Sequence, residues 1–328
     1  MNILLTGGAG YIGSHIAYAL KQAGHVPVTL DDLSHGHLWA VRFGPFVEGD
    51  IGDEQCIRAV CNEYKPKALI HCAALIEAAE SVKQPERYEN NNFHKATKLF
   101  ETARSCGVSH VVMSSTAAVY GEPRHDRPLR ETELLNPLNP YGVSKLAAEQ
   151  ALFALCTSEM NALALRYFNA AGAAEPVLEI GEAHIPESHL VPRIILAGLG
   201  KLEALEICGT DYPTPDGTAI RDYVHVMDLA GAHIAALNYL MAGRDSGVCN
   251  LGTNKGFSVL EVVAAVAKCM GCNVPVWHGQ RRAGDSPRLV ADYSRAAEWL
   301  GWQPKYGLKE IVTSAVSWHK SKRYQGLF

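Results

Sequence analysis

Three glycines near the N-terminus, set behind a short apolar segment, constrain the fold of this chain more than any other feature. Gly7, Gly10 and Gly13 follow residues 3–6, and residues 11–23 carry apolar side chains at helical spacing. A glycine turn between strand and helix lets the backbone approach a pyrophosphate, and the helix N-terminus offers it free N–H groups. A glycine triplet alone is a weak signal, but its position between a strand and a helix is specific. The motif predicts a dinucleotide-binding unit.

An acidic residue closes the second apolar strand at the interval that such a unit requires. Residues 26–30 form this strand, and Asp31 follows it. The carboxylate is placed to accept hydrogen bonds from the adenosine ribose, and it would repel a 2′-phosphate. No Arg or Lys occurs in the next ten residues. The cofactor is therefore predicted to be NAD rather than NADP.

Apolar strands and helical patterns alternate through the first half of the chain. Residues 68–71, 108–113 and 162–166 are predicted strands, and residues 85–106 and 141–160 are predicted long helices. Continuous apolar strands that alternate with helices indicate a parallel sheet covered on both faces. We therefore expect an α/β protein whose first part is a Rossmann-type, doubly wound parallel sheet.

The sequence changes in character after residue 169. Gly, Pro and His occur in irregular runs between 170 and 220, and shorter predicted elements follow, including a helix that a Ser258–Glu261 capping box opens. We find no repeat and no flexible linker. The prediction is an NAD-binding Rossmann domain over 1–169, with a return near 221–250, and a smaller mixed α/β substrate domain over 170–328.

Composition excludes several classes of partner. The net charge of −4 provides no basic surface for nucleic acid, and no apolar run reaches the ~18 residues of a membrane helix. The chain opens directly with strand residues, so we expect no cleaved signal peptide. The nine cysteines are scattered without framework spacing, which favours reduced thiols in a cytoplasmic protein. The pair Cys269 and Cys272 lacks two further ligands, so we predict no metal site.

A tyrosine and a lysine lie four residues apart in the second long helix. Tyr141 and Lys145 share one helix face at this spacing. A free tyrosine has a pKa of about 10, so a tyrosine that acts as a base needs nearby positive charge, which a lysine and an oxidised nicotinamide supply. Thr116, or the neighbouring Ser114 or Ser115, could share the substrate proton. The alternative is an ordinary exposed pair, which the glycine motif makes the weaker interpretation.

Several motifs resemble the extended short-chain dehydrogenase/reductase superfamily: TGGAGYIGS, SSTAAVYG, NPYGVSK and LRYFNAAGA. The second half narrows the resemblance, because GTDYPTPDGTAIRDYVHVMDLA, NLGTNKGFSV and RRAGDSPRLVAD are similar to segments of the UDP-glucose 4-epimerases. The similarity runs nearly from end to end. These second-half motifs are far more specific than the glycine triplet.

The resemblance implies a role for many single residues. Tyr141 is implied as the base, with Lys145 as its partner and Thr116 where many relatives carry Ser. The implied NAD contacts are Gly7, Gly10, Tyr11, Ile12, Gly13, Asp31, Asp32, Leu33, Ser34, Asp50, Ile51, Cys72, Ala73, Ala74, Asn91, Tyr141, Lys145 and Phe168. The implied substrate contacts are Thr116, Tyr141, Asn169, His189, Leu190, Arg221, Tyr223, Arg282, Asp285 and Leu289.

Some positions depart from the pattern of the family. The segment from Cys72 to Ile76 replaces one that in some relatives ends in a lysine near the cofactor. Asp32 replaces a common Asn, and His189 stands where some relatives place Asn. Leu289 occupies the position that gates the sugar pocket, where a large tyrosine is associated with excluding N-acetylated sugars. Leucine is intermediate in size, so the acceptance of UDP-N-acetylhexosamines stays open.

The implied reaction interconverts UDP-galactose and UDP-glucose by NAD-mediated hydride transfer through a 4-keto sugar. Related dehydratases place an acid directly after the strand-end Ser or Thr to expel the sugar 6-hydroxyl, whereas Ala117 and Ala118 follow Thr116 here. A non-catalytic dinucleotide-binding protein is the other alternative, but such proteins usually lack the Tyr and Lys pair. The resemblance also implies a homodimer through the helices at 85–106 and 141–160.

Overall fold

The computed structural model of this chain describes residues 1–282 and 285–327. Its largest element is a seven-stranded, entirely parallel sheet in the order β10-β6-β5-β4-β1-β2-β3. The strands are β1 (Asn2–Thr6), β2 (Val26–Asp31), β3 (Phe46–Glu48), β4 (Ala68–His71), β5 (His110–Thr116), β6 (Asn161–Tyr167) and β10 (Gly247–Leu251). The apolar residues of β1 are fully buried, as expected for a strand covered on both faces. The doubly wound parallel sheet predicted from the sequence is confirmed.

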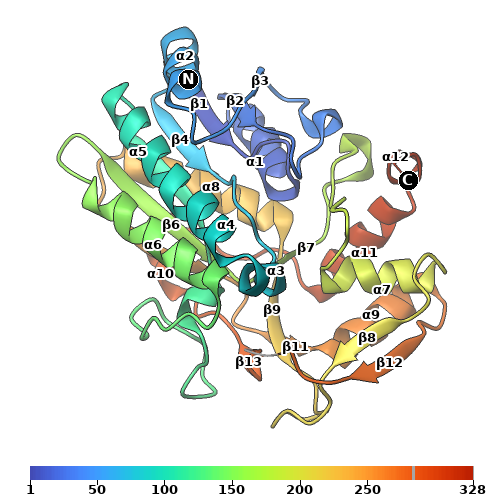
Figure 1. The fold of residues 1–328 in the computed structure, drawn as a ribbon. Coiled ribbons are helices and arrows are strands. Elements are labelled where there is room, and N and C mark those ends of the chain that lie inside the picture. The colour runs from blue at the N-terminus through green and yellow to red at the C-terminus, as the bar shows by residue number, and fades with distance from the viewer. Residues whose placement is uncertain (283–284, 328) are drawn as a thin grey trace.

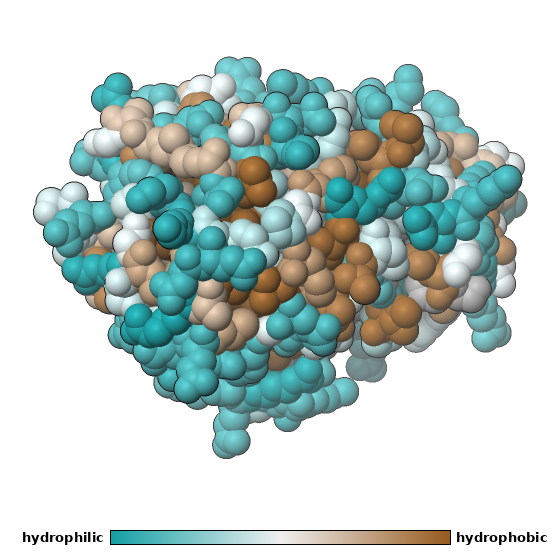
Figure 2. Space-filling model, turned by 90° about the horizontal axis from the view of Figure 1, so that it is seen from above, coloured by the Kyte–Doolittle hydropathy of each residue, from teal (hydrophilic) through white to brown (hydrophobic). Residues whose placement is uncertain are grey.

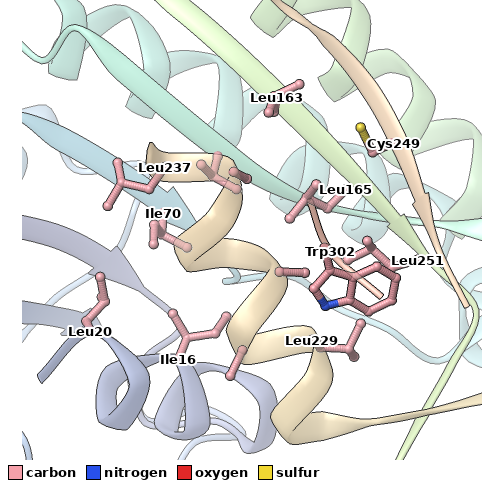
Figure 3. Close-up of a cluster of buried hydrophobic side chains, with 14 of the residues drawn as sticks. Ile16, Leu20, Ile70, Leu163, Leu165, Leu229, Leu237, Cys249, Leu251 and Trp302 are labelled. Atoms are coloured by element: carbon pink, nitrogen blue, oxygen red, sulfur yellow. The ribbon is translucent and has the colours of Figure 1, made fainter. Parts of the chain in front are cut away.

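One face of the sheet is covered by α1 (Tyr11–Gln22), α8 (Val226–Met241) and α10 (Ser294–Leu300). Figure 3 shows the core on this side, where Leu229 of α8 lies close to Trp302, while Ile16 of α1 lies nearer to Leu20 and Ile70. Helix α8 comes from the second half of the chain and packs beside α1. The second half therefore contributes directly to the core of the large sheet.

The opposite face is covered by α2 (Glu54–Tyr64), α5 (Ala96–Ser105) and α6 (Pro140–Ala154), as Figure 1 shows. Ile57 of α2, Phe100 of α5 and Leu152 of α6 are fully buried in one apolar cluster with strand residues. Two short helices, α3 (Ala78–Lys83) and α4 (Pro85–Glu89), pack against the N-terminal part of this layer, and both contact α6.

Two predicted helices differ from the observed ones. The helix predicted over 85–106 is three consecutive segments, because a π-helical stretch (Asn90–Lys95) separates α4 from α5. The helix predicted over 141–160 already ends at Ala154. Thr157 and Met160 exchange backbone hydrogen bonds of 3.0 and 3.3 Å, and this turn leads the chain into β6. Helix α3 was not predicted, since six residues are too few to show helical periodicity.

The remaining strands form two small sheets below the large one in Figure 1. Strand β9 (Ile220–His225) pairs in parallel with β7 (Asn169–Ala171) and β13 (Arg288–Leu289), and antiparallel with β11 (Gly256–Ser258). Strands β8 (Leu205–Cys208) and β12 (Val276–Gly279) form a parallel pair. The helices here are α7 (Leu190–Gly198), α9 (Val259–Met270), α11 (Leu308–His319) and α12 (Lys322–Gln325). The first three share one apolar core.

The chain passes from the large sheet to a small one at residues 167–169. Strand β6 ends at Tyr167, and β7 begins at Asn169 and pairs with β9 rather than with the large sheet. The chain returns through α8 and β10, which is the outermost strand beside β6. This course supports, as a proposal, a division at residue 169 with a return of the second half to the first.

The surface view in Figure 2 is dominated by hydrophilic residues, with hydrophobic ones in small separate groups. None of the described helices is long and apolar enough to cross a membrane. All nine cysteines carry free thiols. The capping box predicted for α9 is present, since Ser258 and Glu261 each bond the backbone of the other.

Candidate active site

The glycine turn forms a close-fitting loop at the N-terminus of α1. Gly7 has a φ of +72°, and a Cβ atom there would lie 2.5 Å from the backbone nitrogen of Ala73. At Gly13 a Cβ atom would lie 2.0 Å from the Gly7 carbonyl oxygen. Gly10 is the N-cap of α1 and provides no side-chain hydrogen bond, and no acidic residue occupies the first turn. The first N–H groups of α1 are thus available to an anion, which fits a dinucleotide pyrophosphate.

Asp31 and the residues after it surround the end of β2. The buried Asp31 carboxylate accepts the backbone N–H groups of Ala9 (3.0 Å) and Leu33 (2.9 Å). Burial raises its pKa, and these two bonds oppose that rise. Leu33 has a φ of +57°, and Asp32 binds the amide and the hydroxyl of Ser34 at 2.9 and 2.6 Å. These contacts hold the turn rigidly beside the glycine loop.

Two further predicted cofactor positions have partners of their own. The Asp50 carboxylate pairs with Lys95 of the π-helical stretch and accepts the Gly52 amide at 2.7 Å, while Ile51 is buried. Asn91 donates to the neighbouring Asn92 at 3.1 Å. The charge of Asp50 is therefore balanced within the protein.

The side chain of Asn92 fixes the segment that follows β4. It accepts the Leu75 amide at 2.8 Å and donates to the Leu75 carbonyl at 2.9 Å, and it also reaches the hydroxyl of Ser144 on α6 at 3.3 Å. The predicted cofactor contacts Cys72, Ala73 and Ala74 lie in this segment. The π-helical stretch thus connects the end of β4 to the helix that carries Tyr141.

Tyr141 and Lys145 lie one turn apart near the start of α6. Asn139 caps this helix by accepting the Gly142 amide at 2.9 Å, and Pro140 occupies its first turn. The Thr116 hydroxyl at the end of β5 lies near the Tyr141 phenol. Burial raises the pKa of Tyr141, and the nearby Thr116 hydroxyl partly offsets that rise.

Lys145 is buried beside groups that face the end of β4. Burial lowers its pKa to about 8, and the nearby side chains of Cys72 and Glu149 oppose this shift. Burial also raises the pKa of the Cys72 thiol to about 11, and Ser114 donates to its sulfur at 3.1 Å. The structure thus brings Tyr141, Lys145, Thr116 and Cys72 together at the carboxyl edge of the sheet.

The structure assigns different partners to the three hydroxyls at the end of β5. Ser114 bonds Cys72, and Ser115 donates to the buried carboxylate of Glu149. The Thr116 hydroxyl accepts the Ala118 amide at 3.1 Å, and of these three hydroxyls it is the one that affects the pKa of Tyr141.

The predicted substrate residues of the second half gather around β9. Arg221 of β9 forms an ion pair with Asp285 (2.8 Å) and donates to the Ser286 carbonyl at 2.8 Å. Tyr223, two residues further along β9, is buried, and Asn169 of β7 pairs with it in register. The exposed Arg282 lies near Asp285 and Cys208.

Charged and imidazole side chains surround His189, directly before α7. The imidazole Nδ1 of His189 lies 2.8 Å from Glu187 and 3.8 Å from Glu182, and His184 bonds Glu182. Burial works against the charged form of His189, but the two carboxylates outweigh it and raise its pKa to about 9. The three side chains Glu182, His184 and His189 are close enough to share a metal ion, but His184 bonds Glu182 while His189 bonds Glu187 instead.

Apolar residues from both halves of the chain form one further cluster beside the site. Phe168 and Leu289 pack against a single cluster with Ala117 and Val119, and Leu129 joins it. Leu289 lies on β13, next to Arg221 in the register of β9. The predicted cofactor contact Phe168 and the predicted gating residue Leu289 are therefore neighbours in one cluster.

Comparison with known sequences decides the family. Residues 3–252 match the sequence profile described as the NAD dependent epimerase/dehydratase family. The chain belongs to this family. Its members include a UDP-glucose 4-epimerase of Rhizobium leguminosarum bv. trifolii, which is 45% identical over 318 residues covering 97% of each chain.

Solved structures agree with this membership of the epimerase/dehydratase family. A UDP-glucose 4-epimerase from Brucella ovis, in complex with NAD, matches with a TM-score of 0.92 and 45% identity, covering 96% of this chain and 97% of that chain. A UDP-glucose-4-epimerase from Stenotrophomonas maltophila, with bound NAD and formylated UDP-arabinopyranose, matches with a TM-score of 0.93 and 39% identity, covering 98% of both chains.

Two carboxylates of the site were not singled out from the sequence. Glu149 lies one turn after Lys145 and binds Arg166 through both carboxylate oxygens, at 3.0 and 2.6 Å. Glu77 precedes α3 and accepts the Ser188 hydroxyl at 2.6 Å. The i,i+4 spacing from Lys145 could have indicated Glu149. No local pattern indicates Glu77, because its partner lies 111 residues away.

Proposed function

We propose that this chain is an NAD-dependent 4-epimerase that interconverts UDP-galactose and UDP-glucose. The observation that carries the proposal is the pair of the half-buried Tyr141 and the buried Lys145, with the Thr116 hydroxyl near the phenol, at the carboxyl edge of a dinucleotide-binding sheet. The 45% identical relatives named UDP-glucose 4-epimerases, aligned over nearly the whole chain, support this substrate pair.

The cofactor is held by the first half of the chain. The glycine turn receives the pyrophosphate, and Asp31 to Ser34 and Asp50 surround the adenosine. The segment 72–74 and Phe168 border the nicotinamide end, together with Tyr141 and Lys145. Bound there, NAD would supply the acceptor for the hydride of the sugar C4 and would be regenerated in each turnover.

The proton transfer belongs to Tyr141. Its phenol oxygen takes the proton of the sugar 4-hydroxyl as the sugar becomes a 4-keto sugar. It then returns this proton to the 4-oxygen as C4 is formed in the opposite configuration. Thr116 lies near the phenol and shares the proton with the substrate hydroxyl. The Lys145 ammonium stabilises the phenolate, which is otherwise unfavourable because burial raises the pKa of Tyr141.

The second half of the chain holds the nucleotide in place while the keto sugar rotates. Arg221 and Arg282 suit the diphosphate, because a guanidinium binds phosphate oxygens through paired hydrogen bonds. Asp285 is placed to accept ribose hydroxyls, and Asn169, Tyr223, His189 and Leu190 complete the contacts. The ion pair of Arg221 with Asp285 already orients both side chains. Because most of the binding affinity comes from contacts with UDP, the keto sugar is free to rotate and to present its other face to the cofactor.

The test replaces the proposed base. Tyr141→Phe keeps the ring but removes the phenol, so the rate of UDP-galactose conversion should fall by at least about 10²-fold. The conversion is followed by a coupled assay for UDP-glucose. Tyr239→Phe on α8 is the matched control and should keep the rate of the native chain. Full turnover by Tyr141→Phe would exclude this tyrosine as the base.

We also propose a homodimer and a cytoplasmic location. The outer faces of α4, α5 and α6 are the proposed interface, and Val143 of α6 supports it because it is 53% exposed. Val143→Glu should shift the sedimentation coefficient from dimer to monomer, and an unchanged coefficient would exclude this face.

The nine free thiols support the proposed cytoplasmic location, because they suit a reducing compartment.

A further inference from the structure

Two imidazoles and two carboxylates meet in the segment that leads into α7. They belong to Glu182, His184, Glu187 and His189, which together form the His–Glu cluster. The Nδ1 atom of His189 lies 2.8 Å from a carboxylate oxygen of Glu187 and 3.8 Å from one of Glu182. The Nδ1 atom of His184 bonds Glu182, and the centroids of the two imidazole rings lie 5.3 Å apart. Four side chains that can bind a metal ion thus converge within eight residues of the sequence.

One carboxylate oxygen of this cluster is buried without a partner. Only 8% of the Glu187 side chain is accessible. Its Oε1 atom accepts the backbone amide of His189 at 2.7 Å and also contacts the ring of His189, whereas its Oε2 atom is buried and has no hydrogen-bond partner among the described residues. Buried carboxylates in proteins are paired, hydrogen-bonded or coordinated to a metal ion. The Oε2 atom of Glu187 therefore indicates a ligand that the described residues do not supply.

Contacts with other elements fix the backbone at both ends of the cluster. At one end, the indole of Trp318 on α11 donates to the Glu182 carbonyl at 2.6 Å. At the other end, the Ser188 hydroxyl donates to the carboxylate of Glu77 at 2.6 Å. The two imidazoles of the cluster remain 17% and 35% accessible, so solvent can reach them. Ligands that are held in place and can be reached from solvent are what a metal site requires.

We infer that the His–Glu cluster is a binding site for one divalent transition-metal ion of the Zn²⁺ type. Imidazole nitrogen and carboxylate oxygen are ligands of Zn²⁺, whereas Mg²⁺ and Ca²⁺ prefer oxygen ligands alone. One ligand atom from each of Glu182, His184 and His189 lies within 4.8 Å of the others, and Glu187, which bonds His189, supplies a fourth ligand. Among the described residues, no other group of three or more His, Cys, Asp or Glu side chains comes this close together.

The charges and the number of ligands define the role of the ion. The two carboxylates balance the two positive charges of the ion, and neutral imidazoles add none. Four protein ligands leave no open position, which is the arrangement of structural rather than catalytic zinc. The ion therefore ties the segment 182–189 together at the start of α7 and stabilises the fold. The sequence-based prediction of no metal site rested on Cys269 and Cys272, which lie elsewhere in the chain.

The experiment measures the Kd of Zn²⁺ by calorimetry in the full chain, after dialysis against a chelator and then against buffer. His184→Gln and Glu187→Gln each remove one ligand and keep a side chain of similar size, so each should raise the Kd at least about tenfold. His94→Gln is the matched control, because His94 also faces a glutamate, Glu89 at 3.7 Å, but lies outside the cluster. This control should keep the Kd of the native chain, and Mg²⁺ should not bind the cluster in any of these proteins.

Thermal unfolding provides a second measurement. Zn²⁺ should raise the Tm of the native chain more than that of either ligand variant, because an ion that binds only the folded state stabilises it. A native chain that does not bind Zn²⁺ would overturn the inference. The same Kd in the native chain and in both ligand variants would overturn it as well, since the ion would then bind elsewhere, such as at the nine free thiols. Zinc binding needs no turnover, so failure to convert UDP-galactose would count against the proposed function alone.

Discussion

Lys145 links burial to chemistry at the level of a single residue. The side chain is almost completely buried, and burial lowers its pKa from 10.5 to about 8. Below this pH the ammonium is charged and, in the proposed mechanism, stabilises the phenolate of Tyr141, whereas above it the charge is lost. The Lys145 charge should therefore increase the reaction rate only below about pH 8.

We expect the kcat/KM for UDP-galactose to fall as the pH rises through about 8. A pH–rate profile of the NAD-loaded protein measures this alkaline limb. Lys145→Met has no ammonium at any pH, so it should lose at least about 10²-fold in rate and also lose the limb. A native profile that stays flat well above pH 8 would contradict the role given to this lysine.

At the scale of elements, a buried ion pair holds α6 in register with the sheet. Glu149 of α6 accepts two bonds from Arg166 of β6 and one from Ser115 of β5. Arg166 also donates to the Tyr120 hydroxyl at 3.1 Å, which in turn donates to Asn250 at 2.7 Å. This network fixes the rotation of the helix that presents Tyr141 and Lys145.

Glu149→Gln should destabilise the fold by about 3–5 kcal/mol, because it leaves the Arg166 charge buried without a partner. Denaturant unfolding measures this loss. The double variant Glu149→Gln/Arg166→Met removes both charges, so it should recover much of the stability. If the double variant is as unstable as the two single losses added together, the ion pair does not account for the effect.

The elements differ in how far the sequence predicts them. Strands β1, β2, β4, β5 and β6 are apolar runs, and the capping box of α9 is a local pattern, so both could be predicted. Strands β3, β7, β11 and β13 have only two or three residues, too few for a period-two pattern. The site follows the same rule, since spacing indicated Tyr141 and Lys145. The position of Glu77 depends on a partner far along the chain, and no local sequence pattern indicates it.

For the whole molecule, buried histidines set the response to acid. Burial lowers the pKa of His15, His225 and His233 to about 4 and that of His71 to about 3. The unfolded chain binds these protons near pH 6.5, so folding stability falls as the pH drops below this value. For one fully buried histidine the loss reaches about 3 kcal/mol near pH 4.

His189 affects the pH dependence of folding stability in the opposite direction. Its pKa is raised to about 9 by its carboxylate partners against the effect of burial. The stability that this group contributes is complete below about pH 6.5 and is lost as the pH rises through 9. The free energy of unfolding should therefore be greatest between these limits.

Denaturant unfolding at a series of pH values measures both slopes. His233→Asn removes one buried histidine, so the acid slope should become shallower. His94→Asn replaces an exposed histidine, with 58% of its side chain accessible, and should leave the slope unchanged. Equal acid slopes for the native chain and His233→Asn would show that this histidine does not drive the acid response.

The most direct test of the account is to incubate the purified protein with UDP-galactose, without added NAD, and to follow UDP-glucose in a coupled assay. The account predicts turnover, because the cofactor is regenerated in each cycle and stays in the site that the glycine turn and Asp31 form. Failure to form UDP-glucose, even after NAD is supplied, would contradict the proposed 4-epimerase activity.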